Sequence, residues 1–204
     1  MLDRIASSRA ALRFDGVGSG DIFRTFFGFG FEHILKGSDH LIFLLGLWLV
    51  CHRIRELVWI VTSFTIAHSL TLAASTLGWV RLPDAAVEIG IAATIAFVGF
   101  ENLARKGEPK WRVSVTFLFG LLHGFGFSNV LRELLPAAGG GVPALPLLAF
   151  NLGVEIGQLA ATGVGLPLIW WLRRLPATKD HAVRVGSSLV LAFGLFWMIE
   201  RLWT

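Results

Sequence analysis

Residues 30–50 read GFEHILKGSDHLIFLLGLWLV, a stretch whose second half is almost entirely apolar. A helix needs about 20 mostly apolar residues to cross the hydrocarbon core of a bilayer, and this stretch has that length. Ionisable side chains are costly at membrane depth, so they mark a functional site by default. The stretch therefore predicts both a membrane span and a site within it. Its charged or imidazole side chains are Glu32, His33, Lys36, Asp39 and His40.

The composition extends the membrane interpretation to the whole chain. Of 204 residues, 54% are hydrophobic and 16% are charged, whereas soluble domains carry about a quarter charged residues. The mean hydropathy is +0.68 and the pI is about 10.0. These values exclude a soluble globular domain and a disordered chain, and we attribute the basic balance to loops rather than to nucleic-acid binding. The single cysteine, Cys51, excludes an intrachain disulfide framework and a cysteine-rich metal cage.

Six segments are long and apolar enough to cross a bilayer, and glycines or prolines lie in or near the gaps between them. Backbone polar groups in lipid must be satisfied within each segment, so the expected fold is an all-α bundle. We expect residues 1–22 to form a short N-terminal tail and residues 23–204 to form one six-helix membrane domain. The approximate spans are 23–50, 57–78, 85–103, 113–132, 144–172 and 184–203.

The charges of the loops predict the orientation of this domain. Lysines and arginines gather in the first, third and fifth loops, whereas the second and fourth loops hold only Arg81 and Arg132. Basic loops stay in the cytoplasm, so the odd-numbered loops are predicted to be cytoplasmic and both termini to lie outside.

Histidines and other polar side chains also occur inside the later spans. A single membrane histidine is often only a helix-to-helix hydrogen-bond partner, but their accumulation with acids on several helices favours metal or proton handling. Imidazole with carboxylate suits a divalent transition metal such as Ni, Co or Zn, whereas Ca and Mg prefer oxygen ligands alone. The candidate metal ligands are His33, Asp39, His40, His68, His123 and Glu155. Candidate supporting or pathway residues are Glu32, Thr65, Ser69, Glu88, Asn151 and Gln158.

Spacing within the first span restricts how its histidines can share an ion. His33 and His40 are seven residues apart, which is about 10 Å along an unbroken helix. One ion can bridge them only if the helix is interrupted, and Gly37-Ser38 is the candidate place. Lys36 follows Glu32 by one turn and is expected to neutralise it.

We expect the side chains of His33, His68 and His123 to converge within metal-bridging distance, because they share one depth on three helices. His52 and His181 lie in charged loops and are predicted to be dispensable. The last span has no comparable polar group before its end and is predicted only to pack.

A short repeat suggests internal organisation. Val-Glu-Ile-Gly occurs at 87–90 and again at 154–157, each time after a span with a central histidine. We therefore expect a weak parallel repeat of the second and third spans in the fourth and fifth, with Glu88 and Glu155 facing one central cavity. Two glycine pairs with GxxxG spacing predict close helix packing, namely Gly120 with Gly124 and Gly153 with Gly157.

Five motifs follow one another along the chain and together resemble the HupE/UreJ family. These small bacterial membrane proteins are linked to hydrogenase and urease maturation and are regarded as nickel or cobalt permeases. The resemblance covers nearly the whole chain after residue 22 and implies a six-helix module of a bacterial inner membrane. It places His33, Asp39 and His40 in the family's metal motif. The motifs are His33-x5-Asp39-His40, Phe64-Thr65-x-Ala67-His68-Ser69-x-Thr71-Leu72, Glu88, His123-Gly124-Phe125-Gly126-Phe127 and Phe150-Asn151-x-Gly153-Val154-Glu155-x-Gly157-Gln158.

Three functions are compatible with these residues. The first is a secondary nickel or cobalt permease, since the sequence has no Walker A motif for ATP hydrolysis. The second is an intramembrane metal-dependent hydrolase of zinc type. A permease needs polar groups that reach the cytoplasmic face, whereas a hydrolase can end in a closed pocket. A haem-associated anchor ranks last, because it leaves the acids unexplained. The expected partners are the lipid bilayer, the metal ion and, as an option, a second copy of the chain.

Overall fold

The structure is a computed structural model that describes residues 18–104, 111–134, 144–175 and 181–203. Most of the predicted N-terminal tail lies outside the described residues, as do the basic loop residues Arg105, Lys106, Lys110 and Lys179. Every regular element in the described ranges is an α-helix, which confirms the all-α class. The helices are α2 (Ser19–Lys36), α3 (Ser38–Val50), α4 (Ile54–Thr76), α5 (Asp84–Ala104), α6 (Arg112–Phe125), α7 (Ser128–Leu134), α8 (Ala144–Arg174) and α9 (Ala182–Trp203).

Four of these helices are long and apolar enough to cross a membrane on their own: α4, α5, α8 and α9. Two bent pairs, α2 with α3 and α6 with α7, pass the same test together, with bends of 64° and 45°. The described chain thus has four candidate spans, or up to six if each bent pair counts as one. The helix bounds follow the predicted segments to within a few residues, except that the break between α6 and α7 was not anticipated.

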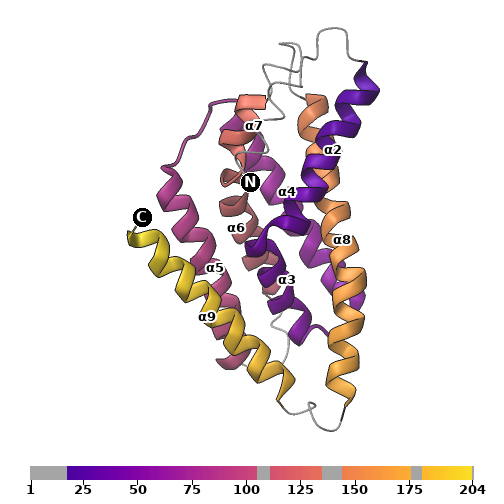
Figure 1. The fold of residues 1–204 in the computed structure, drawn as a ribbon, viewed down its shortest axis with the longest axis vertical. Coiled ribbons are helices and arrows are strands. Elements are labelled where there is room, and N and C mark those ends of the chain that lie inside the picture. Colours follow the sequence, from indigo (N-terminus) through magenta and orange to yellow (C-terminus); the bar gives the residue numbers. More distant parts are fainter. Residues whose placement is uncertain (1–17, 105–110, 135–143, 176–180, 204) are drawn as a thin grey trace.

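The helices form an elongated bundle (Figure 1). Most helices begin near one of its two opposite ends, which we call the poles, and finish near the other. One pole holds α7 and the starts of α2 and α8, and the other holds the end of α8 and the start of α9. α8 runs antiparallel to α4, and the short 51–53 loop between α3 and α4 lies toward the second pole. Under the loop-charge prediction this second pole is the cytoplasmic one.

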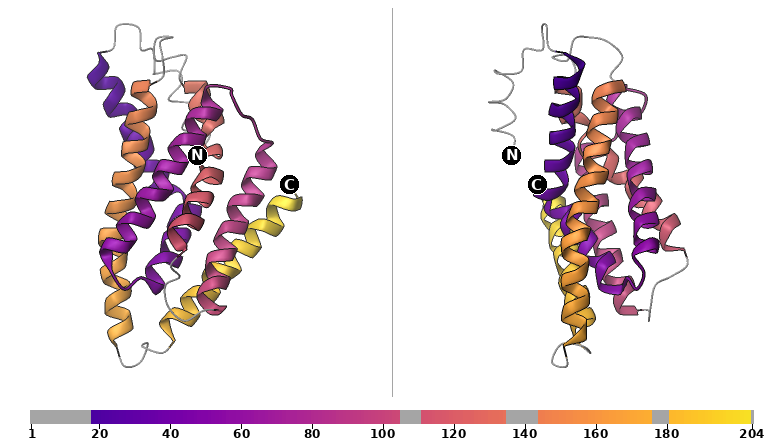
Figure 2. Two further views of the ribbon diagram at one scale, coloured as in Figure 1. Left: turned by 180° about the vertical axis from the view of Figure 1, so that it is seen from behind. Right: turned by 90° about the vertical axis from the view of Figure 1, so that its right-hand side faces the viewer.

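Glycines bring three helix pairs into close backbone contact: α2 with α8, α4 with α6, and α5 with α9 (Figure 2). A Cβ at Gly120 or Gly124 would meet the backbone of α4, and a Cβ at Gly153 would meet the backbone of α2. A Cβ at Gly157 would lie 3.1 Å from the Cβ of Ile34. Both predicted GxxxG packing surfaces are therefore confirmed.

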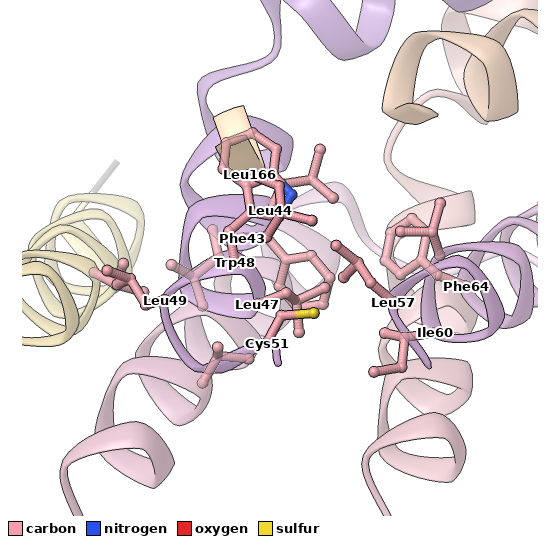
Figure 3. Close-up of a cluster of buried hydrophobic side chains, with 14 of the residues drawn as sticks. Phe43, Leu44, Leu47, Trp48, Leu49, Cys51, Leu57, Ile60, Phe64 and Leu166 are labelled. Atoms are coloured by element: carbon pink, nitrogen blue, oxygen red, sulfur yellow. The ribbon is translucent and has the colours of Figure 1, made fainter. Parts of the chain in front are cut away.

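Apolar side chains fill the interior toward the second pole and also cover much of the outside. Phe43, Leu47, Leu57 and Phe64 belong to one buried cluster between α3 and α4 (Figure 3). Large apolar side chains are also exposed along the helices, for example Phe100 at 59%. Contiguous exposed apolar surface of this kind marks contact with lipid rather than with water. The chain is therefore a multi-pass membrane protein.

We predict that Gly153→Ala destabilises the protein by about 1–3 kcal/mol, because the added methyl group overpacks the α2–α8 contact. Gly163 lies on the same helix with open space at its Cβ position. The control Gly163→Ala should be neutral or stabilising by up to about 1 kcal/mol, since alanine is the better helix former. Thermal unfolding in one detergent measures both variants, and equal melting temperatures would contradict the packing assignment.

Candidate metal centre

Three imidazoles from three helices converge in the interior. His33 of α2, His40 of α3 and His68 of α4 each offer a ring nitrogen, and these nitrogens all lie within 4.8 Å of one another. His40 and His68 are buried, and His33 is half-buried. Three nitrogens at this separation can be drawn onto one tetrahedral ion, whose Zn–N bonds measure about 2.0–2.1 Å. We call these three residues the imidazole group.

The break between α2 and α3 makes this convergence possible. Gly37 has extended backbone angles, φ −77° and ψ 100°, so the helix stops at Lys36 and restarts at Ser38. The rings of His33 and His40 then lie only 4.7 Å apart between centroids. A Cβ at residue 37 would lie 2.6 Å from the His33 carbonyl oxygen and 3.1 Å from Nδ1 of His40, so a larger residue has no room. The predicted interruption at Gly37-Ser38 is confirmed.

The imidazole group has free binding capacity. The Nε2 atoms of His33, His40 and His68 are buried and have no hydrogen-bond partner. A buried polar atom without a partner costs free energy, commonly about 1–3 kcal/mol. Three such atoms in one place fit a metal ion that accepts their lone pairs.

Asn151 orients His68. Nδ1 of His68 lies 3.3 Å from the carbonyl oxygen Oδ1 of Asn151, whose amide group donates to the Leu147 carbonyl oxygen. An oxygen opposite Nδ1 requires the proton to sit on Nδ1, which leaves Nε2 as the neutral lone-pair donor. This is the common arrangement in which an outer hydrogen bond fixes the tautomer of a ligating histidine.

His123 stands beside the imidazole group rather than in it. Its ring centroid lies 5.2 Å from that of His40, and its side chain is 1% exposed. Thr94 uses its hydroxyl proton on the Ile91 carbonyl oxygen and lies 3.0 Å from Nε2 of His123. Nε2 therefore donates to Thr94, and the buried Nδ1 is the atom left without a partner. His33 and His68 converge as predicted, but the third imidazole of the group comes from His40 and not from His123.

Asp39 is held by the last helix. Its Oδ2 accepts a hydrogen bond from Arg201 of α9 at 2.9 Å, while its Oδ1 is buried without a partner. Asp39 thus precedes His40 in the sequence, but its side chain is not part of the imidazole group. The prediction that the last span only packs is wrong, because Arg201 ties α9 to this carboxylate. Arg201 sits beyond the apolar run of its span, where the sequence gives no sign of an inward partner.

Glu88 does not face a central cavity. Its side chain is 56% exposed, and its Oε2 lies 4.0 Å from Nε of Arg201, which also donates to the Glu88 carbonyl oxygen. Glu155 is half-buried and accepts a hydrogen bond from Thr62. The expectation that the two glutamates face one cavity is therefore wrong, since Glu88 lies at the exposed end of α5. The predicted parallel repeat, which rested on the two glutamates facing one cavity, is not confirmed.

The stripe predicted on α8 faces α4. Gln158 accepts a hydrogen bond from Thr65 at 2.8 Å, and Glu155 accepts one from Thr62 at 2.7 Å. Ser69 donates to the Thr65 carbonyl oxygen of its own helix. Thr62 was not singled out from the sequence, because one threonine in an apolar helix carries no signal without knowledge of the facing helix.

The remaining predicted residues lie at the surface. Lys36 pairs with Glu32 and both side chains are more than half exposed, which confirms the expected neutralisation and removes Glu32 from the interior. His52 and His181 are exposed.

A buried ion pair near the second pole was not predicted. Arg112 donates to Glu101 at 2.9 Å and to Asn102 at 2.8 Å, with Arg112 and Glu101 side chains 4% and 5% exposed. The sequence gives no sign of this pair, because Arg112 stands beside the other basic residues between the third and fourth predicted spans.

The sequence of the chain matches one family model. The model of the family described as HupE / UreJ protein matches residues 10–201, nearly the whole chain. The chain belongs to the HupE/UreJ family. Neither a search of curated proteins nor one of solved structures gave a match. Membership supports a metal-related accessory or transport role for a membrane protein of this kind.

We predict that Asn151→Ala lowers the affinity for Ni²⁺ or Zn²⁺ by about 10–100-fold, as is usual when the partner that orients a ligating histidine is lost. Equilibrium dialysis of purified protein measures this affinity. Asn129 is an exposed asparagine that bonds to Asp84, so Asn129→Ala is the matched control and should bind metal normally. Equal affinities in the two variants would show that Asn151 does not orient a ligand.

Proposed function

We propose that this chain is a permease that carries a divalent transition metal, with Ni²⁺ as the favoured cargo, across the bacterial inner membrane. His33, His40 and His68 hold the ion in transit, and His123 stands ready as a further imidazole. The family supports the metal, and the donor chemistry supports a late first-row ion, because imidazole suits Ni, Cu and Zn better than Ca or Mg.

The observation that carries this proposal is a polar seam that leads from the imidazole group along α8 toward the second pole. It begins with Asn151 at His68 and continues through the side chains of Glu155 and Gln158 against α4. One turn further, Thr162 accepts a hydrogen bond from the Trp48 indole at 3.2 Å. A permease needs a polar route of this kind, whereas a hydrolase can end in a closed pocket.

Beyond Thr162 the side chains of α8 are apolar as far as Trp170, and polar contacts resume at the loop between α3 and α4. Trp170 and Arg173 of α8 both donate to the Cys51 carbonyl oxygen, each at 3.2 Å. The loop-charge rule supports a cytoplasmic position for this end, and therefore inward passage of the ion. Beside the seam, Phe43 and Phe64 are about 1% exposed and close the interior. Passage requires these apolar side chains to separate, so the route is gated rather than an open pore.

A zinc-type hydrolase is the second candidate, and one observation favours it. Three imidazoles around one position leave a fourth position open, which is the donor set of several catalytic zinc sites. The seam has no use in such an enzyme. Movement of the metal into a sealed compartment therefore separates the two candidates.

The test is uptake of Ni²⁺ into sealed proteoliposomes that contain a metal-responsive dye. We predict that wild-type protein loads the lumen and that His68→Ala slows loading at least 10-fold, because one of three ligands is lost. The loop variants His52→Ala and His181→Ala should load within about twofold of wild type, since water already satisfies these exposed imidazoles. Stoichiometric metal binding without any loading would contradict transport and favour the hydrolase.

Metal binding should weaken in acid. Ligating histidines must be neutral, and protons compete with the metal for the same ring nitrogens. We predict that the affinity for Ni²⁺ falls by at least 10-fold between pH 7.5 and about pH 4, because protons compete more strongly for the ring nitrogens as the pH falls. Titration calorimetry at both pH values measures the change. An affinity that stays constant over this whole range would contradict ligation by imidazole.

A further inference from the structure

The seam contains a second group of ligand atoms that differs from the imidazole group in chemistry. It consists of Thr62 and Thr65 on α4 and of Glu155 and Gln158 on α8, and we call it the oxygen group. Its hydrogen bonds run between the two helices, Thr62 to Glu155 at 2.7 Å and Thr65 to Gln158 at 2.8 Å. Every side-chain atom in these two bonds is an oxygen.

The four side chains meet at one level of the bundle. α4 and α8 are antiparallel, so Thr62 lies nearer the second pole than Thr65, whereas Glu155 lies farther from it than Gln158. The two hydrogen bonds therefore cross and bring all four side chains to the same height. At 1.5 Å per residue this level is about 7–8 Å from the His68–Asn151 pair toward the second pole. The oxygen group is thus a separate station, one to two turns beyond the imidazole group.

The oxygen group also has unused binding capacity. Oε2 of Glu155 is buried and has no hydrogen-bond partner, although Oε1 is bonded to Thr62. A buried carboxylate is costly unless a positive charge or further donors compensate it. Neither an arginine nor a lysine pairs with Glu155 in the part of the chain that the structure describes. No basic side chain of the described residues therefore balances this carboxylate.

The boundary between α4 and α8 can adjust to an occupant. Gly120 and Gly124 of α6 pack against α4, and Gly153 and Gly157 of α8 pack against α2. The facing sides of α4 and α8 are instead held by side-chain hydrogen bonds, which can open without backbone movement. An ion can enter between these side chains at the cost of the Thr62–Glu155 bond.

We propose that the oxygen group binds Na⁺ as the coupling ion of the permease, an inference that rests on the proposed transport function. Hydroxyl, carboxamide and carboxylate oxygens suit a hard cation, and the absence of imidazole from the group gives a nickel-type ion no preference for it. The single carboxylate balances a single positive charge, as a monovalent ion requires in a medium of low dielectric. Na⁺ bound there would replace hydrogen bonds that now join α4 to α8, so its arrival changes the same boundary through which the metal passes.

The first experiment measures saturable binding of ²²Na⁺ to purified protein, with choline as the balancing cation. We expect wild-type protein to bind Na⁺ in preference to K⁺, and Glu155→Gln and Thr62→Val to weaken binding at least 10-fold. Matched controls on α4 are Ser63→Ala, whose hydroxyl donates to the Val113 carbonyl oxygen, and Glu56→Gln, whose carboxylate pairs with exposed Arg53. Both controls should bind Na⁺ within about twofold of wild type.

Binding of Ni²⁺ is measured on the same samples. It should stay within about threefold of wild type in Glu155→Gln and Thr62→Val, which shows that these variants are folded. Wild-type protein that binds Ni²⁺ but shows no saturable ²²Na⁺ binding would overturn the inference. So would Glu155→Gln protein that keeps full Na⁺ affinity, or a loss of half of the bound Ni²⁺ in that variant, which would make the group a second station for the cargo.

Proteoliposomes test the coupling. An inward Na⁺ gradient should speed Ni²⁺ loading several-fold in wild type and have no effect in Glu155→Gln. Loading that responds only to a proton gradient would overturn Na⁺ coupling while leaving the permease intact. Saturable Na⁺ binding without any Ni²⁺ loading would instead overturn the proposed function and leave the Na⁺ site standing.

Discussion

The bend of 64° at Gly37 is the constraint on which the site depends. An unbroken helix would hold His33 and His40 about 10 Å apart, whereas the break brings their rings to 4.7 Å between centroids. A helix break within a membrane leaves backbone groups without their usual partners, so it is tolerated only where protein surrounds it. Here Gly37 donates to the His33 carbonyl oxygen at 2.9 Å and accepts from Leu41 at 3.1 Å. The chain thus keeps backbone hydrogen bonds across the break while it turns two imidazoles toward each other.

Around this bend the helices meet through two kinds of contact, stiff backbone contacts at glycines and adaptable side-chain hydrogen bonds. Glycines fix α2 to α8, α4 to α6 and α5 to α9 at backbone distance, where even one added methyl group has no space. The imidazole group takes His33 from the first of these pairs and His68 from the second, so a bound metal would link two stiff units. Between the same units runs the seam of side-chain hydrogen bonds. A metal centre and an adjustable boundary therefore coincide, which is the arrangement expected where binding must be coupled to movement.

Sequence reasoning reached the parts of this structure that follow from local pattern. Apolar length predicted the helices and their approximate bounds, GxxxG spacing predicted which faces pack closely, and the seven-residue gap between His33 and His40 pointed to the break at Gly37. The contacts it missed join residues far apart in the chain. Arg201 reaches Asp39 across 162 positions and Thr62 reaches Glu155 across 93, and neither pairing has a local signature. The prediction for Glu88 was wrong because it rested on local pattern alone. The repeated Val-Glu-Ile-Gly sequence does not reveal that its first copy lies at an exposed helix end.

The central claim is that imidazoles from α2, α3 and α4 bind one metal ion together. X-ray absorption spectroscopy of the Ni²⁺-loaded protein measures this most directly, because imidazole rings give a multiple-scattering pattern that water and carboxylate do not. The account predicts a first shell with three imidazole nitrogens at about 2.0–2.1 Å, the range of metal–histidine bonds. A first shell made only of oxygen atoms, or one with a single imidazole, would contradict it.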